Sequence, residues 1–290
     1  MARSFTLQIP AASNARRKRR KVLITGAAGR IGSYLASRFH SRYDLRLMVR
    51  GNEKNLARLG KFGKVVTAEL ADLGRLKQLC RGIDTVVHLA ANPDPMAVWS
   101  ELLEPNIVGV YNILVAAKSA GCRRVILASS VHAVTGYPVD VQVKAGDPVN
   151  PGDLYGVTKC FAEALGRYMA EREGLSVIAL RIGAYLSHAA ARTSGSIRMM
   201  EQWVSPRDLQ QLIERCIEAD HVRWAVFNAL SGNRFNKLDL SEPRELLGYA
   251  PQDDITRINP DLKKLEFRKH VRAGNASDFD FRSGLRDDLR

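Results

Sequence analysis

Tyr155 and Lys159 are two residues whose types and spacing could do chemistry together. They stand four positions apart, so on a helix they lie one turn apart on the same face. A phenol is a poor base at neutral pH, and a neighbouring ammonium favours its phenolate form. Such a tyrosine can exchange a proton with a substrate hydroxyl while another group takes a hydride. About half a match to this spacing is expected by chance in a chain of this length, so the pair gains its meaning from its context.

A glycine-rich segment near the start of the chain supplies part of that context. The apolar run Val22–Thr25 leads directly into Gly26, Gly29 and Gly32, and a helical pattern continues to Phe39. A parallel strand that feeds a helix through glycines is typical of dinucleotide binding, with the pyrophosphate at the helix N-terminus. An ordinary loop could also carry three glycines. Its place between a strand and a helix favours cofactor binding.

The remaining elements predict how these residues are positioned. Apolar runs alternate with amphipathic helical patterns, which favours a parallel sheet covered by helices on both faces. Further strands are expected at Leu45–Val49, Lys64–Thr67, Thr85–Leu89, Arg124–Ser129, Ser176–Ile182 and Trp224–Asn228, and helices at Leu73–Cys80, Val98–Ala120, Leu154–Glu171 and Pro206–Glu218. The expected fold is α/β, a doubly wound parallel sheet (Rossmann fold) with a small C-terminal substrate lobe. Residues 21–182 would form the cofactor domain and residues 183–290 the lobe and tail.

Composition narrows the class of protein. The chain has 290 residues, is 46% hydrophobic and carries a net charge of +14. No apolar run approaches the roughly 18 residues that span a bilayer, and the four scattered cysteines favour reduced thiols in the cytoplasm and no metal site. Half of the net charge falls in residues 1–21, which have no acid. We expect residues 1–20 to be a basic, disordered tail, and nucleic acid to be an improbable partner because no recognition motif accompanies the charge.

Several motifs occur together in order and identify a family. They are Thr25-Gly-Ala-Ala-Gly-Arg-Ile-Gly32, Asp84-Thr-Val-Val-His-Leu-Ala-Ala91, Asn106-Ile-Val-Gly109, Ser129-Ser130, Tyr155-Gly-Val-Thr-Lys159 and Arg181-Ile-Gly183. Over about residues 21–255 the chain resembles the extended short-chain dehydrogenase/reductases, in the NAD-dependent epimerase/dehydratase group. Within that group it is most similar to uronate dehydrogenases.

The resemblance implies a role for each matching residue. Ser130, Tyr155 and Lys159 would be catalytic: Ser130 would bind the reacting oxygen, Tyr155 would act as base, and Lys159 would lower the pKa of Tyr155 and bind the nicotinamide ribose. Substrate would contact Asn92, Ser130, His132 and Arg198, the last through a carboxylate. The cofactor would contact Gly26, Gly29, Arg30, Ile31, Gly32, Arg50, Asp72, Leu73, Leu89, Ala90, Ala91, Asn106, Tyr155, Lys159 and Ile182.

The chain departs from the uronate dehydrogenase pattern at three positions. Val131, Pro93 and Ala184 stand where polar substrate contacts are expected. A site that loses hydrogen-bonding partners discriminates against the original polar substrate. The dehydrogenase chemistry is therefore expected, whereas specificity for a uronate, another sugar or a sugar phosphate stays open.

The end of the second strand bears on the choice of cofactor. An acid usually holds the ribose 2′-hydroxyl of NAD there. Arg50 stands near this position, and Arg30 could join it, which favours the 2′-phosphate of NADP over NAD. Arg50 could instead stack on the adenine and select neither cofactor.

The function predicted from the sequence is NAD(P)-dependent oxidation of a sugar or uronate hydroxyl at C1 of a cyclic hemiacetal, giving a lactone. Two alternatives belong to other classes: a sugar-nucleotide epimerase or dehydratase with bound NAD, and a non-catalytic NADP-binding protein with a basic tail that attracts nucleic acid. By resemblance we expect a homodimer or higher homo-oligomer, formed through the helices at Val98–Ala120 and Leu154–Glu171.

Overall fold

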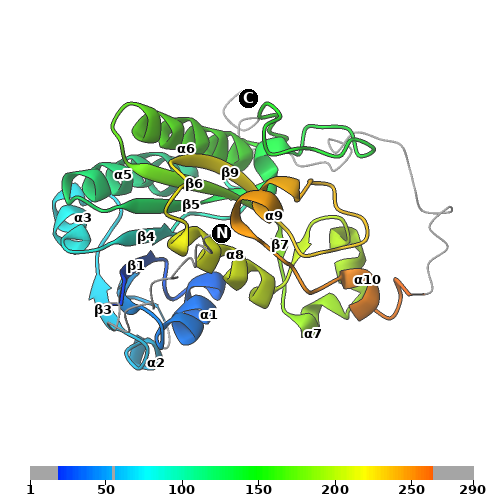
Figure 1. Ribbon diagram of the computed structural model, residues 1–290, viewed down its shortest axis with the longest axis horizontal. Helices are drawn as coiled ribbons and strands as arrows, with labels where there is room; N and C mark the ends of the chain where they lie inside the picture. Colours follow the sequence, from blue (N-terminus) through cyan, green and yellow to red (C-terminus); the bar gives the residue numbers. More distant parts are fainter. Residues whose placement is uncertain (1–18, 54–55, 264–290) are drawn as a thin grey trace, which may run out of the picture.

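A single seven-stranded sheet organises the chain in the computed structural model, which describes residues 19–53 and 56–263 (Figure 1). Its strand order is β3-β2-β1-β4-β5-β6-β9, and every pairing is parallel. The strands are β1 (Lys21–Thr25), β2 (Asp44–Val49), β3 (Lys64–Thr67), β4 (Thr85–His88), β5 (Arg124–Ser130), β6 (Ser176–Ile182) and β9 (Trp224–Ala229). The chain reverses direction across the sheet between β1 and β4, which is where ligands bind in such folds. The predicted doubly wound fold is confirmed.

Helices cover both faces of the sheet. One apolar cluster unites α3 (Leu73–Cys80), α5 (Gly109–Ser119) and α6 (Leu154–Glu171) with one face. The other cluster unites α1 (Arg30–Phe39) and α8 (Pro206–Glu218) with the opposite face. Because both faces are buried, the strands are continuous apolar runs rather than alternating ones.

The long helix expected at Val98–Ala120 is interrupted. It consists of α4 (Trp99–Leu102), the π-helical turn η1 (Leu103–Val108) and α5. Pro105 lies within the interruption and cannot donate the backbone hydrogen bond that a regular helix requires. Wide π turns of this kind occur often at functional sites, and this one carries the buried Asn106.

The C-terminal lobe is not one continuous segment after Ile182. It contains the short strands β7 (Ala184–Tyr185) and β8 (Trp203–Val204), which pair with each other, together with α7 (His188–Ala191), η3 (Ser194–Met199) and α10 (Ile255–Ile258). Between these, α8 and β9 return to the main domain, and β9 pairs with β6 as the edge strand. Two further elements are the short α2 (Leu56–Leu59) and α9 (Ser241–Leu247). The sheet therefore extends into the region that the sequence assigned to the lobe.

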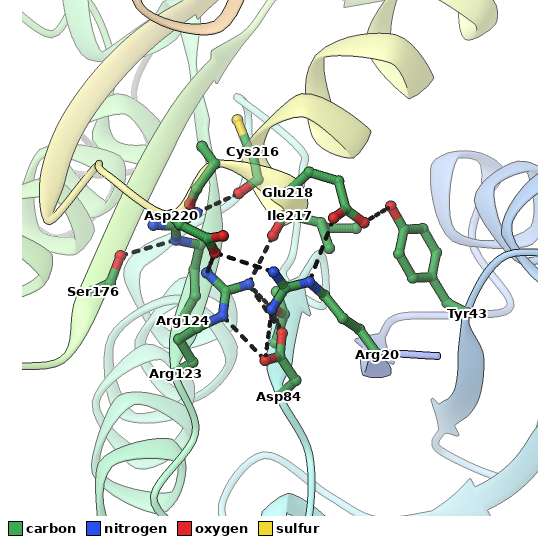
Figure 2. A network of polar contacts seen from close by, with 12 residues as sticks. Arg20, Tyr43, Asp84, Arg123, Arg124, Ser176, Cys216, Ile217, Glu218 and Asp220 are labelled. Atoms are coloured by element: carbon green, nitrogen blue, oxygen red, sulfur yellow. Dashed lines mark hydrogen bonds and ion pairs between the residues drawn. The ribbon is translucent and has the colours of Figure 1, made fainter. Parts of the chain in front are cut away.

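An ion-pair network lies at the amino ends of β1 and β4 (Figure 2). Arg20 pairs with Asp84, Glu218 and Asp220, and Arg123 pairs with Asp84 as well. Arg20 was assigned to the basic tail by sequence, but its guanidinium joins β1, β4 and the end of α8. Residues 1–18 of the predicted tail lie outside the described residues. Among the described residues no helix is long and apolar enough to cross a membrane, and no group of His, Cys, Asp and Glu side chains could hold a metal ion.

Candidate active site

The glycine loop between β1 and α1 is packed too tightly for a side chain at Gly26 or Gly32. Gly26 has φ +64°, and a Cβ there would lie 2.9 Å from the backbone nitrogen of Ala90. A Cβ at Gly32 would lie 2.3 Å from the carbonyl oxygen of Gly26. The loop is thus folded tightly against the start of α1, whose first amides have no partners within the helix and can hold an anion. This cradle fits the pyrophosphate of a dinucleotide, and Arg30 and Ile31 form the first turn of that helix.

Thr25 connects the glycine loop to the loop after β4. Its hydroxyl oxygen accepts hydrogen bonds from the backbone amides of Leu89 (3.1 Å) and Ala90 (3.2 Å), and lies 2.8 Å from Nδ1 of His88. With two donors already bound, the hydroxyl donates its own proton to His88. Burial, with a smaller contribution from Lys159, lowers the pKa of His88 to about 3, so this imidazole is neutral. The bonds hold the segment from Leu89 to Ala91 beside the cradle.

Ser130, Tyr155 and Lys159 are brought together at the carboxyl end of β5. Ser130 is the last residue of β5, and Tyr155 lies in the first turn of α6, with its phenol close enough to the Ser130 hydroxyl for that hydroxyl to lower the pKa of Tyr155. Nζ of Lys159 lies 5.2 Å from the centroid of the Tyr155 ring and donates a 3.0 Å hydrogen bond to the carbonyl of Ala128. All three side chains are buried. The geometry places a hydroxyl, a phenol and an amine in one buried group.

Burial has the largest effect on the pKa values of Tyr155 and Lys159. Burial raises the pKa of Tyr155 to about 12; the bond with Ser130 lowers it and the charge of Asp153 raises it. Burial lowers the pKa of Lys159 to about 8. In both groups desolvation is the largest effect, and it disfavours the ionised form.

His132 lies within the same group of side chains. It belongs to the short helix η2 (Val131–Val134), and its ring meets the Tyr155 ring edge-on with the centroids 5.4 Å apart. Its Nδ1 lies 2.5 Å from Oδ2 of Asp153, a residue that the sequence analysis did not select. Asp153 stands directly before α6 and caps it, a position that an acid before a helical pattern could have revealed.

Asn106 and Asn92 form internal support for the site. Oδ1 of Asn106 accepts from the backbone of Asn92 (2.8 Å), and its Nδ2 donates to the carbonyl of Asn92 (3.0 Å) and to Thr158 (3.1 Å). Asn106 is 1% exposed. Its side chain therefore joins the loop after β4 to α6 at Thr158, the residue before Lys159.

Glu53, a second acid that the sequence analysis did not select, lies beside Arg50, the cofactor contact expected at the end of β2. Its carboxylate accepts hydrogen bonds from the backbone amides of Arg50 (2.9 Å) and Gly51 (2.8 Å), and its Oε1 lies 3.8 Å from Nε of Arg50. Arg30 instead lies near Tyr185, whose pKa burial raises and Arg30 lowers.

Three other expected contacts lie on separate elements. Asp72 caps α3 by accepting from the amide of Arg75 (2.8 Å), with Leu73 following as the first residue of that helix. Ile182 is buried at the end of β6. Arg198 is exposed in η3, and no ion pair or hydrogen bond links it to the buried triad within the part of the chain that is described.

The three departures from the uronate dehydrogenase pattern lie in different surroundings. Val131 is 4% exposed and belongs to the main apolar cluster. Pro93 is exposed in the loop after β4, and Ala184 begins β7. At Val131, the position of a possible polar contact has become part of the core.

The family model described as NAD dependent epimerase/dehydratase family matches residues 22–246 of this chain. The chain belongs to this family. It is 33% identical over 257 residues to the L-arabinose 1-dehydrogenase (NAD(P)(+)) of Haloferax volcanii, covering 82% of this chain and 98% of that protein. It is 31% identical to the uronate dehydrogenase of Pseudomonas putida, covering 80% and 84% respectively. The family expectation from the sequence is confirmed.

A solved family member has the same architecture. The crystal structure of uronate dehydrogenase from Agrobacterium tumefaciens superposes with a TM-score of 0.74 at 29% identity, covering 87% of this chain and 88% of that one. A second structure of that enzyme is a mutant complexed with NAD. The glycine cradle described above is therefore found in a family that includes nicotinamide-dependent dehydrogenases.

Proposed function

We propose that this protein is an oxidoreductase that oxidises a sugar or uronate hydroxyl by hydride transfer to a nicotinamide cofactor. The observation that carries the proposal is the buried group of Ser130, Tyr155 and Lys159, which lies at the carboxyl end of the sheet. The glycine cradle lies at the same edge, after β1. The relatives named above support it, because they are sugar and uronate dehydrogenases that match most of the chain. For the same reason the epimerase and the non-catalytic alternatives are not favoured.

The residues divide the proton chemistry among themselves. The Ser130 hydroxyl binds the oxygen of the substrate and orients it, and the phenolate oxygen of Tyr155 takes the hydroxyl proton. As that proton leaves, the carbon loses a hydride and the carbon–oxygen bond becomes a carbonyl, so that a cyclic hemiacetal gives a lactone. Lys159, fixed by Ala128, provides positive charge beside the phenol. The bound nicotinamide supplies the hydride acceptor.

Two charged side chains after β2 favour different cofactors. Arg50 favours the 2′-phosphate of NADP, as expected from the sequence. Glu53 holds a carboxylate on the amides of Arg50 and Gly51, where a ribose hydroxyl could donate to it and a phosphate would be repelled. We therefore infer that NAD is bound at least as tightly as NADP.

An apolar surface supports the expected homodimer. Several large apolar side chains are exposed on α4, η1, α5 and α6; they are Trp99, Leu103, Val108, Tyr111, Val157 and Tyr168. These elements contact one another, and exposed apolar patches mark interaction surfaces. A second copy of α5 and α6 would cover these side chains in a four-helix interface. The cytoplasmic location stays a prediction.

The experiment that tests the function is reduction of NAD and NADP by the purified protein, followed by absorbance, with neutral aldoses, uronates and sugar phosphates as substrates. We expect turnover of at least one sugar class, and the replacement Tyr155→Phe should abolish it while dinucleotide affinity changes little. Substantial turnover by Tyr155→Phe would exclude the proposed mechanism. Absence of turnover on the whole panel, with the cofactor still bound, would exclude the proposed substrates.

A further inference from the structure

A cavity of about 370 Å³ lies at the end of the sheet where β1, β2 and β3 begin. The strands run parallel, and Ser130 ends β5 at the opposite end of the sheet. The cavity is therefore separate from the active site. Ligand pockets typically measure about 300–1,000 Å³, so this volume suits one small molecule. The lining residues that bear a charge or an aromatic ring are Arg19, Lys21, His40, Tyr43, Asp44 and Phe62.

The charged side chains of the cavity differ from those of the neighbouring ion-pair network. In that network Arg20 is paired with Asp84, Glu218 and Asp220. By contrast, the side chains of Arg19, Lys21 and Asp44 form no ion pair or hydrogen bond among the described residues. Lys21 and Asp44 are register partners at the start of β1 and β2. The cavity thus offers two cations and a carboxylate to a ligand.

Aromatic rings stand beside these charges and are held by their own contacts. The centroids of the His40 and Phe62 rings lie 5.1 Å apart, with the planes at 45°. Nδ1 of His40 donates to the carbonyl of Ser37 (3.0 Å), since a carbonyl can only accept. Phe62 packs against the main apolar cluster, and the Tyr43 hydroxyl donates to Glu218 (2.8 Å). Flat heteroaromatic rings stack on aromatic side chains of this kind.

Charge and aromaticity together narrow the chemistry of the ligand. A bare anion such as inorganic phosphate would be attracted by Arg19 and Lys21 but repelled by Asp44. A neutral aromatic molecule would leave both cations unmatched. A nucleotide carries a phosphate and a flat ring, and in cytosine, adenine and guanine it also carries an amino group that donates to a carboxylate.

We propose that this cavity binds a nucleotide unit whose base bears an amino group. The base stacks on Phe62 and His40, its amino group donates to Asp44, and its phosphate is held by Arg19 and Lys21. A free nucleotide and a single-stranded nucleic acid share this chemistry, and the experiment distinguishes them. Because the cavity lies at the end of the sheet away from the glycine cradle, the site is additional to the cofactor site and independent of the proposed oxidation.

CMP and UMP form the test pair, because their bases differ in presenting an amino group or a carbonyl oxygen at the same position. Calorimetry is carried out on the full chain with saturating NAD, which occupies the glycine cradle. We expect CMP to bind at least about tenfold more tightly than UMP, since Asp44 accepts from the first and repels the second. Asp44→Asn should abolish this preference, because its amide can donate to UMP. Equal affinities in the wild type would overturn the proposal, as would competition between CMP and NAD.

Lys21→Gln tests the phosphate contact, and Lys61→Gln is its matched control. Lys61 is exposed next to Phe62 in the chain but does not line the cavity. We expect Lys21→Gln to weaken CMP binding about five- to tenfold and Lys61→Gln to weaken it less than about twofold. Phe62→Leu keeps an apolar side chain and should weaken binding about tenfold through lost stacking. Equal losses in the two lysine variants would overturn the proposal, because general charge would then hold the phosphate.

A deoxycytidine oligonucleotide of about ten residues, a length that such sites accommodate, distinguishes the two sources of the nucleotide unit. Binding of the strand more tightly than CMP, with the same sensitivity to Phe62→Leu, would assign the cavity to single-stranded nucleic acid. Binding of CMP with no gain for the strand would assign it to a free nucleotide. Failure of both to bind, or strand binding that Phe62→Leu leaves unchanged, would overturn the proposal.

Discussion

Nζ of Lys159 lies 5.2 Å from the centroid of the Tyr155 ring, and both side chains are withdrawn from solvent. Burial disfavours the charged form of each group, so the pKa of the phenol rises to about 12 and the pKa of the amine falls to about 8. The protein keeps a neutral phenol beside an amine that is still mostly protonated at pH 7. The reactive ionisation states are therefore formed against the effect of the fold, at a cost in stability.

Removing the buried amine should stabilise the protein at neutral pH. The lowered pKa of Lys159 corresponds to about 3 kcal/mol, and loss of the bond to Ala128 gives back about 1 kcal/mol. We expect Lys159→Met to raise the free energy of unfolding at pH 7 by about 1–3 kcal/mol while turnover is lost. The lowered pKa penalises the folded state fully below pH 8, and the penalty disappears as the pH rises from about 8 to the unfolded value of 10.5. In urea unfolding, the difference in free energy of unfolding between Lys159→Met and the wild type should therefore be smaller at pH 10 than at pH 7. A difference that widens with pH would contradict the assignment.

Local sequence patterns predicted most of the fold because the central strands are buried on both faces and the longer helices each have one apolar stripe. They did not reveal the interruption at Pro105, since the apolar period continues through it, or the return of β9 to the main sheet, which depends on long-range pairing. Asp153 and Glu53 were missed for a related reason. Their roles depend on which backbone amides and ring nitrogens the fold brings to them.

The glycine cradle should distinguish between two neighbouring substitutions. A Cβ at Gly32 would lie 2.3 Å from the Gly26 oxygen and 2.8 Å from Cα of Ala27, so the backbone would have to move. At Gly29 the nearest atom is 3.2 Å away, and a small adjustment suffices. We expect Gly32→Ala to weaken dinucleotide binding by about a hundredfold, since displacements of about 1 Å have such effects. Calorimetry should show this loss for Gly32→Ala and, for Gly29→Ala, only the loss that a methyl group facing the dinucleotide causes, and an unchanged affinity in Gly32→Ala would place the dinucleotide elsewhere.

Glu53 should control the choice between the two cofactors. In Glu53→Gln the negative charge next to Arg50 is lost while the side chain keeps its shape. We expect affinity for NADP to rise about five- to tenfold relative to NAD, the size of a single screened charge interaction. Titration with adenosine 2′,5′-bisphosphate and with AMP tests the same preference without turnover. Arg50→Gln is the matched opposite and should lower the affinity for the 2′-phosphate. An unchanged ratio in Glu53→Gln would show that this acid does not face the ribose.

The apolar face of α5 and α6 should determine the oligomeric state. Tyr111 is 50% exposed in α5, and a glutamate there would place a charge within the proposed four-helix interface. We expect the wild type to sediment as a dimer and Tyr111→Glu to sediment as a monomer with unchanged helix content. Leu246→Glu is the control, because Leu246 is 49% exposed in α9, outside this face. A monomeric wild type would show that the face serves another purpose.

A buried ion pair beneath the site should be worth much more than an exposed pair on the same helix. Glu163 accepts two hydrogen bonds from Arg181 (3.0 and 2.9 Å) and one from Ser129 (2.6 Å), so it locks α6 to β5 and β6 next to Ser130. Removing one partner of such a pair leaves an uncompensated charge and costs about 3–5 kcal/mol. Glu163→Gln should therefore lower the free energy of unfolding by that amount. Glu171, which pairs with Arg167 on the exposed side of α6, supplies the control. Glu171→Gln should change stability by less than about 1 kcal/mol, and equal losses in urea unfolding would mean that solvent reaches the inner pair.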